Sequence, residues 1–201
     1  MSRVKFSTAV AVAVSLLLIA PGSVFAQKAA ASKDAAVTPS LAEAHVQMRN
    51  AVAKAHAEKK GVLIKFSASW CGPCIGFDRF LFDTTGVGAI MQKYFVIVPL
   101  IALENPPKDV LNTPGAEKLA AEMSGGGALA STGIPYFFML NGDGVKTGDS
   151  NNMPDKTNIG QPVSKVEVES FDRLLQVTAP LMTAAERARI KQFLDRDARR
   201  S

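Results

Sequence analysis

Apolar residues gather in short runs that are typical of buried strands. The runs cover about residues 62–67, 94–101 and 134–140, and a short, weak strand is expected near 145–148. A short apolar run bounded by turn residues fits a strand that is covered on both faces. The pattern therefore predicts a sheet of about four strands.

Other segments carry the signals of helices. Ser40, Ser164 and Thr183 each begin a Ser/Thr-x-x-Glu capping box, in which the first residue and the glutamate satisfy each other's backbone N–H groups. Apolar residues at helical spacing follow each box. A further helix is expected to begin with Pro114 at its tolerated first position and to end at the glycines 125–127.

The first 26 residues have the layout of a secretory signal peptide. Arg3 and Lys5 precede an apolar run of about twelve residues, which Pro21 ends, and cleavage is expected after Ala26. A helix that spans a bilayer needs about twenty residues, so this run is too short to span one, and an uncleaved anchor is the alternative to a cleaved leader. We therefore expect a protein that is secreted across the inner membrane into the periplasm.

The rest of the chain divides into a tether and one domain. Residues 27–39 are rich in Ala, Ser and Lys, which is typical of a flexible linker. Residues 40–201 are long enough for one domain with its own core and a C-terminal helical extension. Removing Arg3 and Lys5 with the leader lowers the net charge from +5 to +3. Such a small excess does not indicate nucleic acid binding.

The chemistry of the chain is concentrated in Trp70-Cys71-Gly72-Pro73-Cys74, which contains its only two cysteines. The motif follows a predicted strand and begins a predicted helix. A helix N-terminus lowers the pKa of a cysteine from about 8.5 to about 3.5–7.5, and the resulting thiolate attacks disulfides. We expect Cys71 to be the nucleophile and Cys74 to resolve the mixed disulfide. Gly72 and Pro73 set the turn, and Trp70 either shields the pair and contacts partners or is a surface-packing aromatic.

A zinc site is not expected, because zinc takes four ligands and the motif supplies two. The only histidines, His45 and His56, lie on a predicted helix well before the motif. Two thiolates suit Cu(I) better than zinc, but no Met-rich loop lies near them. We therefore expect neither a metal nor a cofactor.

These residues resemble those of the thioredoxin superfamily, and in particular its exported thiol–disulfide oxidoreductases. Both Trp-Cys-Gly-Pro-Cys after a strand and Gly133-Ile134-Pro135 before an apolar run are similar to that family. Over about residues 40–175 the resemblance implies an α/β thioredoxin-like fold with a central mixed sheet of about four strands flanked by helices; here an extra C-terminal helix follows. It also implies a cis bond between Ile134 and Pro135, which would face the cysteines and line a groove for an extended substrate segment.

One departure from the family concerns the strand before the motif. Thioredoxin has a buried Asp where this chain has Lys65. An ammonium near Cys74 would stabilise its thiolate and make the disulfide more oxidising, so Lys65→Asp is expected to lower the reduction potential. Alternatively, Lys65 reaches solvent or pairs with an acid.

A second departure concerns the strand that contains Pro99. In thioredoxin this strand is flanked by an N-terminal strand, but the residues before Ser40 contain no strand-like run. Proline lacks the N–H for a sheet ladder and is confined to edges and bulges. We therefore expect a four-stranded sheet with Pro99 on its edge.

Three functions fit these residues. The first is an exported oxidoreductase that exchanges disulfides with partner proteins and is recharged by a membrane or soluble redox partner. The second is a non-enzymatic peptide-binding module with a passive disulfide. The third is a Cu(I)-handling dithiol protein. The Gly-Pro dipeptide resembles that of reducing family members, whereas Lys65 leaves the direction of electron flow open.

Overall fold

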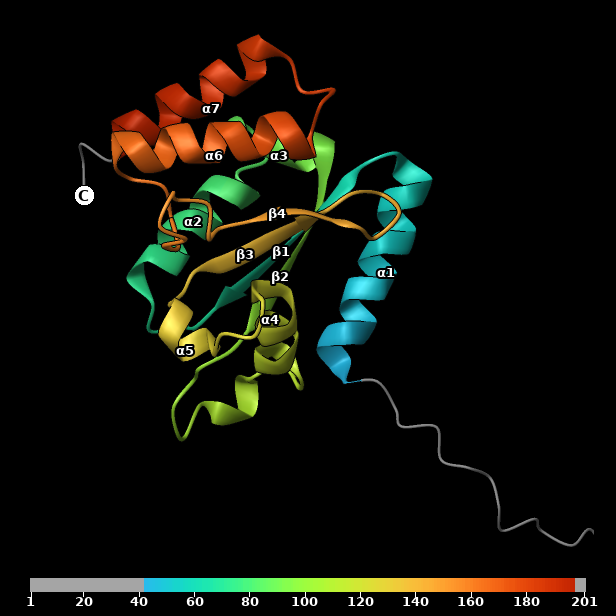
Figure 1. The fold of residues 1–201 in the computed structure, drawn as a ribbon, viewed down its shortest axis with the longest axis vertical. Helices are drawn as coiled ribbons and strands as arrows, with labels where there is room; N and C mark the ends of the chain where they lie inside the picture. The colour runs from blue at the N-terminus through green and yellow to red at the C-terminus, as the bar shows by residue number, and fades with distance from the viewer. Residues whose placement is uncertain (1–41, 198–201) are drawn as a thin grey trace, which may run out of the picture. The chain divides into compact units, whose positions relative to one another are not determined.

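The structure, a computed structural model, describes residues 42–197, so the predicted signal peptide (1–26) and tether (27–39) lie outside the described residues. A central sheet has helices on both of its faces (Figure 1). None of the described helices has the length and apolar character needed to cross a membrane. The elements are α1 (Glu43–Glu58), β1 (Gly61–Ser67), α2 (Gly72–Phe82), α3 (Val87–Tyr94), β2 (Phe95–Ile101), the 3-10 turn η1 (Asp109–Leu111), α4 (Ala116–Ser124), α5 (Leu129–Thr132), β3 (Tyr136–Leu140), β4 (Lys146–Asp149), α6 (Lys165–Thr178) and α7 (Ala184–Asp197).

The strands form one mixed sheet in the order β2-β1-β3-β4. β1 is parallel to β2 and antiparallel to β3, and β3 is antiparallel to β4. This arrangement confirms the predicted strands and the predicted fold class. Within residues 42–197, β2 pairs with β1 alone, and Pro99 lies on this edge strand opposite Lys65. The missing N–H of the proline is tolerated there because one side of an edge strand has no ladder to complete.

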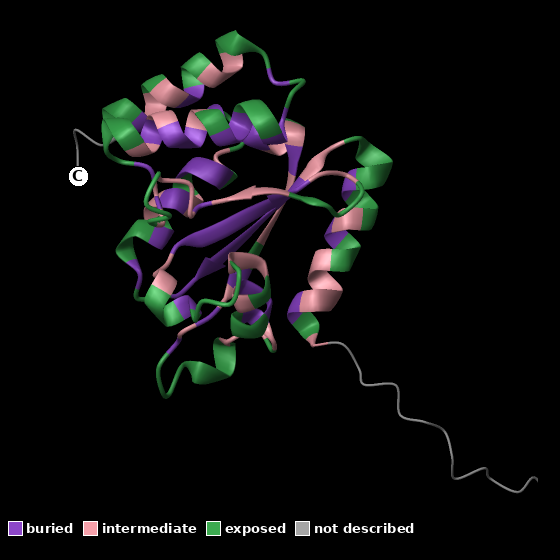
Figure 2. Ribbon diagram, in the orientation of Figure 1, coloured by how far each residue is buried: buried purple, intermediate pink, exposed green. Residues whose placement is uncertain are grey.

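β1 is buried on both faces because helices cover each side of the sheet (Figure 2). Val62, Ile64 and Phe66 belong to a core that includes α1 and α4. Leu63 belongs to the opposite core, which includes α2, α3, α6 and α7. Since side chains alternate along a strand, Lys65 shares the face of Leu63 and points toward the α2 side.

Two of the three predicted capping boxes are present. The Ser164 hydroxyl accepts the N–H of Glu167, whose carboxylate accepts the Ser164 N–H. Thr183 and Glu186 make the same pair of bonds at the start of α7. The start predicted at Ser40 is wrong, since the N-cap of α1 is Ala42 and no side chain caps it.

The predicted start of α4 is also wrong. Pro114 was expected at the first helical position, but the helix begins at Ala116. Gly115 has a φ of 82° and acts as the N-cap. This left-handed conformation separates Pro114 from the helix and is one that glycine adopts at little cost.

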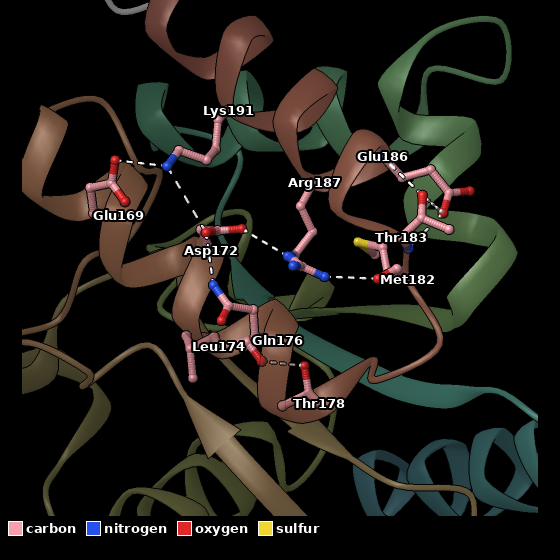
Figure 3. A network of polar contacts seen from close by, with 10 residues as sticks. All are labelled: Glu169, Asp172, Leu174, Gln176, Thr178, Met182, Thr183, Glu186, Arg187 and Lys191. Carbon is pink, nitrogen blue, oxygen red and sulfur yellow. Dashed lines mark hydrogen bonds and ion pairs between the residues drawn. The ribbon is translucent and has the colours of Figure 1, made fainter.

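The extra C-terminal helix, α7, is held by both apolar and polar contacts. Ile190 and Leu194 are buried in the α2 side of the core. Figure 3 shows the polar contacts between α6 and α7 and the capping residues at the start of α7. Within this network Arg187 lies 3.3 Å from Asp172, and Lys191 lies 2.7 Å from Glu169.

The carboxylate of Glu186 joins the start of α7 to α3. It lies 2.8 Å from Lys93 Nζ and accepts a hydrogen bond of 2.8 Å from the Tyr94 hydroxyl. Together with the Thr183 backbone N–H, these contacts lower the pKa of Glu186 to about 2, from an ordinary value of 4.5. A carboxyl whose pKa is lowered by folding stabilises the folded state above its unfolded pKa, and this contribution disappears as the pH falls through its folded pKa.

We predict that Glu186→Gln lowers the free energy of unfolding by about 1 kcal/mol at pH 7, a modest figure because the group is near the surface. The difference from the wild type should shrink below about pH 4.5 and vanish near pH 2, as urea unfolding at a series of pH values would measure. Glu117→Gln, at an exposed acid in the first turn of α4, is the control. A difference that does not depend on pH, or an equal loss in the control, would contradict this account.

Candidate active site

The two cysteines lie where the chain passes from β1 to α2. Cys71 is the N-cap of α2 and has the extended backbone typical of that position, and Cys74 lies in the first turn. Pro73 also lies in the first turn, where a missing N–H costs little. The motif therefore begins a helix, as its residues predicted.

The sulfur of Cys71 caps this helix. The backbone N–H of Cys74 donates a hydrogen bond of 3.2 Å to Cys71 Sγ. The two sulfurs are joined in a disulfide with an S–S distance of 2.06 Å. Cys71 keeps 4% of its surface exposed, whereas Cys74 keeps 0%. Cys71 is thus the member of the pair that solvent reaches.

The loop before β3 lies against the cysteine pair. The carbonyl oxygen of Ile134 is 3.6 Å from Cys71 Sγ, and Ile134 packs against the buried cluster of Ala68, Cys71 and Cys74. The Ile134–Pro135 peptide bond is cis. Thr132, Gly133 and Ile134 are partly exposed, whereas Pro135 is buried, so part of this loop is accessible beside the cysteines.

The residues just before Cys71 are bonded to the loop after β2. Trp70 is 56% exposed, and its Nε1–H donates a hydrogen bond of 2.9 Å to the carbonyl of Leu103. The buried carboxylate of Glu104 accepts hydrogen bonds from the backbone N–H of Ser69 and from its hydroxyl. Sequence reasoning missed Glu104, because it lies 35 residues from Ser69 and no local pattern connects them.

Lys65 is fully buried between β1 and α2. Its Nζ lies 2.6 Å from Asp78 Oδ1 and donates to the Ser67 hydroxyl at 3.2 Å and to the Cys74 carbonyl at 3.3 Å. Lys65 therefore both approaches the backbone of the cysteine pair and pairs with an acid, two outcomes that the sequence analysis treated as alternatives. Burial lowers the pKa of Lys65, and the hydrogen bond and charge of Asp78 act against that shift.

Asp78 was not predicted as a site residue. It follows Cys74 by four residues on α2, and residues at this spacing lie on the same face of a helix. That spacing is the signal that could have found it. The chain thus has a lysine on β1, the departure from the family noted in the sequence, and a carboxylate on α2 that pairs with it.

The described residues contain no group of three or more His, Cys, Asp or Glu side chains that could hold a metal ion. The two histidines contact different acids. His45 lies 2.9 Å from Glu122, and His56 lies 3.3 Å from Asp143.

Comparisons with known proteins gave a matching family model and several similar solved structures. A family model described as thioredoxin-like matches residues 43–142. Among solved structures, a disulphide isomerase from Xylella fastidiosa Temecula1 is 20% identical, with a TM-score of 0.44 over 79% of this chain and 93% of that one. A DsbH oxidoreductase is 14% identical, with a TM-score of 0.42 over 64% and 81%. Thioredoxin O2 from Arabidopsis thaliana is 16% identical, with a TM-score of 0.33 over 52% and 73%.

A search of curated protein sequences gave no significant match. Structural likeness at such low identity does not transfer an activity. The family-model match is supported by a mixed sheet in the order β2-β1-β3-β4 and by a Cys-x-x-Cys pair at the start of α2. The chain therefore belongs to the thioredoxin superfamily.

Proposed function

We propose that the protein is an exported thiol–disulfide oxidoreductase that exchanges disulfides with partner proteins through Cys71 and Cys74. The observation that carries the proposal is the N-cap position of Cys71. Its sulfur accepts a hydrogen bond from the N–H of Cys74, and Cys71 is the more exposed member of the pair. The same N–H and the partial positive charge at the start of α2 would stabilise a Cys71 thiolate.

The reducing reaction takes two exchange steps. The Cys71 thiolate attacks one sulfur of a partner disulfide, so a Cys71–partner bond forms and the other partner sulfur leaves as a thiolate. Cys74 then loses its proton and attacks the Cys71 sulfur, which forms the Cys71–Cys74 disulfide and releases the second partner thiolate. Two electrons pass from the pair to the partner, and the reverse steps oxidise a partner dithiol.

The loop around Ile134 supports a polypeptide substrate. The Ile134 carbonyl oxygen is 3.6 Å from Cys71 Sγ, and the Ile134 side chain is partly exposed beside it. An extended segment that carries a disulfide could lie along this loop while its sulfur meets Cys71. The exposed ring of Trp70 would form a second contact with the partner protein.

Export to the periplasm is supported by the leader at residues 1–26, which has a basic start, a short apolar run and a small-residue cleavage site. A disulfide pair can act in that oxidising compartment as an oxidant, or as a reductant if another protein supplies electrons. We therefore also propose a membrane or soluble redox partner that recharges Cys71 and Cys74.

We predict that the mature protein reduces insulin disulfides and that Cys71→Ser abolishes this activity. Cys74→Ser should instead accumulate a mixed disulfide with the substrate, because the thiol that resolves it is gone. Non-reducing electrophoresis and mass spectrometry of the adduct would measure both results. The chain has no third cysteine, so any adduct of Cys74→Ser must form through Cys71.

The opposite pattern would overturn the assigned roles: an adduct that forms with Cys71→Ser and not with Cys74→Ser. Absence of insulin reduction by the wild type, together with tight Cu(I) binding in a titration, would favour a Cu(I)-handling protein. Absence of both activities would favour a binding module with a passive disulfide.

We predict opposite shifts of the reduction potential when the two members of the Lys65–Asp78 pair are removed. Asp78→Asn leaves the ammonium unopposed beside Cys74, stabilises the reduced form and raises the potential. Lys65→Met leaves the carboxylate unopposed and lowers it. A shift of about 30 mV corresponds to about 1.4 kcal/mol, which is a reasonable size for one charge that acts at an effective dielectric constant of about 20. Equilibration against glutathione would measure both shifts.

The rise in Asp78→Asn should disappear at alkaline pH. Burial lowers the pKa of Lys65, and Asp78 is the contact that raises it, so the variant should lose the lysine charge at a lower pH than the wild type. Asp83→Asn, at the C-terminal end of the same helix, is the control and should leave the potential unchanged. Shifts of the same sign in Asp78→Asn and Lys65→Met would contradict an electrostatic role.

A further inference from the structure

The segment between β4 and α6 lies against the loop that faces Cys71. Its start is fixed to β3, because the buried Ser150 hydroxyl accepts the N–H of Phe137 at 3.1 Å and the Ser150 carbonyl accepts the N–H of Ile159 at 2.8 Å. Ile159 is itself buried in the core on the α2 side of the sheet. These contacts give the next residues of the segment a fixed position beside the Ile134–Pro135 loop.

Asn158 holds that loop through its side-chain amide. Its Nδ2 lies 3.0 Å from the carbonyl oxygen of Gly133, 3.2 Å from that of Pro135 and 3.3 Å from that of Thr132. The amide nitrogen carries two hydrogens, which these three oxygens share. The Oδ1 atom accepts a hydrogen bond of 2.9 Å from the N–H of Gly160, so both polar atoms of the side chain bond within the protein.

The three carbonyls lie on both sides of Ile134 in the chain. The Ile134 carbonyl itself is not bonded by Asn158 and faces Cys71 Sγ at 3.6 Å. Fixing the peptide groups before and after Ile134 therefore sets the position of its carbonyl relative to the reactive sulfur. Gly160 lies close to the same loop, since a Cβ built at this residue would lie 3.6 Å from a ring carbon of Pro135.

We propose that Asn158 is a positioning residue that holds the 132–135 loop at the cysteine pair for polypeptide substrates. The inference rests on the proposed exchange reaction and adds a determinant of its specificity. A polypeptide must lie along the loop while its disulfide meets Cys71. A small disulfide such as oxidised glutathione reaches the sulfur with little contact to the loop. Loss of Asn158 therefore impairs the reaction with polypeptides more than the reaction with small disulfides.

The test compares two substrates for the reduced mature protein: insulin and oxidised glutathione. Asn158→Asp keeps the size of the side chain but places a carboxylate oxygen against three carbonyl oxygens. We expect its kcat/KM for insulin to fall at least about tenfold, mainly through a higher KM, because an acceptor cannot replace the donated bonds. The rate with glutathione disulfide should stay within about twofold of the wild-type rate. Asn50→Asp, on the exposed surface of α1, is the control for the substitution itself.

Asn158→Ser serves if the aspartate variant does not fold, because its shorter side chain removes the donated bonds without adding a charge, and the same selective loss is expected. Equal losses with both substrates, or no loss with either, would overturn the role of Asn158 while the proposed function stands. A wild-type protein that reduces neither substrate would overturn the proposed function, and this inference with it.

Discussion

The hydrogen bond of 3.2 Å from the backbone N–H of Cys74 to the sulfur of Cys71 fixes that sulfur at the start of α2. In most helices a Ser, Thr, Asp or Asn side chain accepts such a bond. Here a sulfur takes that place, so the group that ends the loop after β1 is also the group that we propose as the nucleophile. The helix can supply an N–H and its partial positive charge to a thiolate only because the chain turns at this residue.

Contacts from outside the motif hold the turn in place. Glu104, in the loop after β2, bonds the backbone and side chain of Ser69, and the carbonyl of Leu103 accepts the indole N–H of Trp70. On the other side of the pair, Asn158 bonds the loop that contains Ile134. The buried ammonium of Lys65 reaches the Cys74 carbonyl from beneath, with Asp78 as its counter-ion. These groups come from the loop after β2, the segment after β4, β1 and α2, so the site depends on the complete fold.

Local sequence patterns were sufficient to predict the strands, the edge of the sheet and the helix at the cysteine motif. The strands followed from short apolar runs, and Pro99 marked the edge of the sheet because its missing N–H excludes a central position. The cysteine motif predicted the helix α2, which begins there. Predictions failed at Ser40 and Pro114, where the sequence allowed a helix start but the helix begins two residues later.

Partners that the fold brings from a distance could not be predicted in the same way. Glu104 and Asn158 carry no local signal, since an acid in one loop and an amide in another acquire a role only after β2 and β4 have been placed in the sheet. The sequence showed that a lysine stands at position 65. Whether its ammonium contacts solvent, an acid or the cysteine pair could be known only from the packing of α2 against β1.

The reduction potential of the wild-type Cys71–Cys74 pair tests the central claim most directly. An exchange-active pair must be both reduced and oxidised by partner proteins, so equilibration against glutathione should give one reversible two-electron transition. Its potential should lie between about −270 and −120 mV, the range of thiol–disulfide oxidoreductases. A potential below about −300 mV, as structural disulfides have, would mean that the pair is a passive bond and would contradict the account.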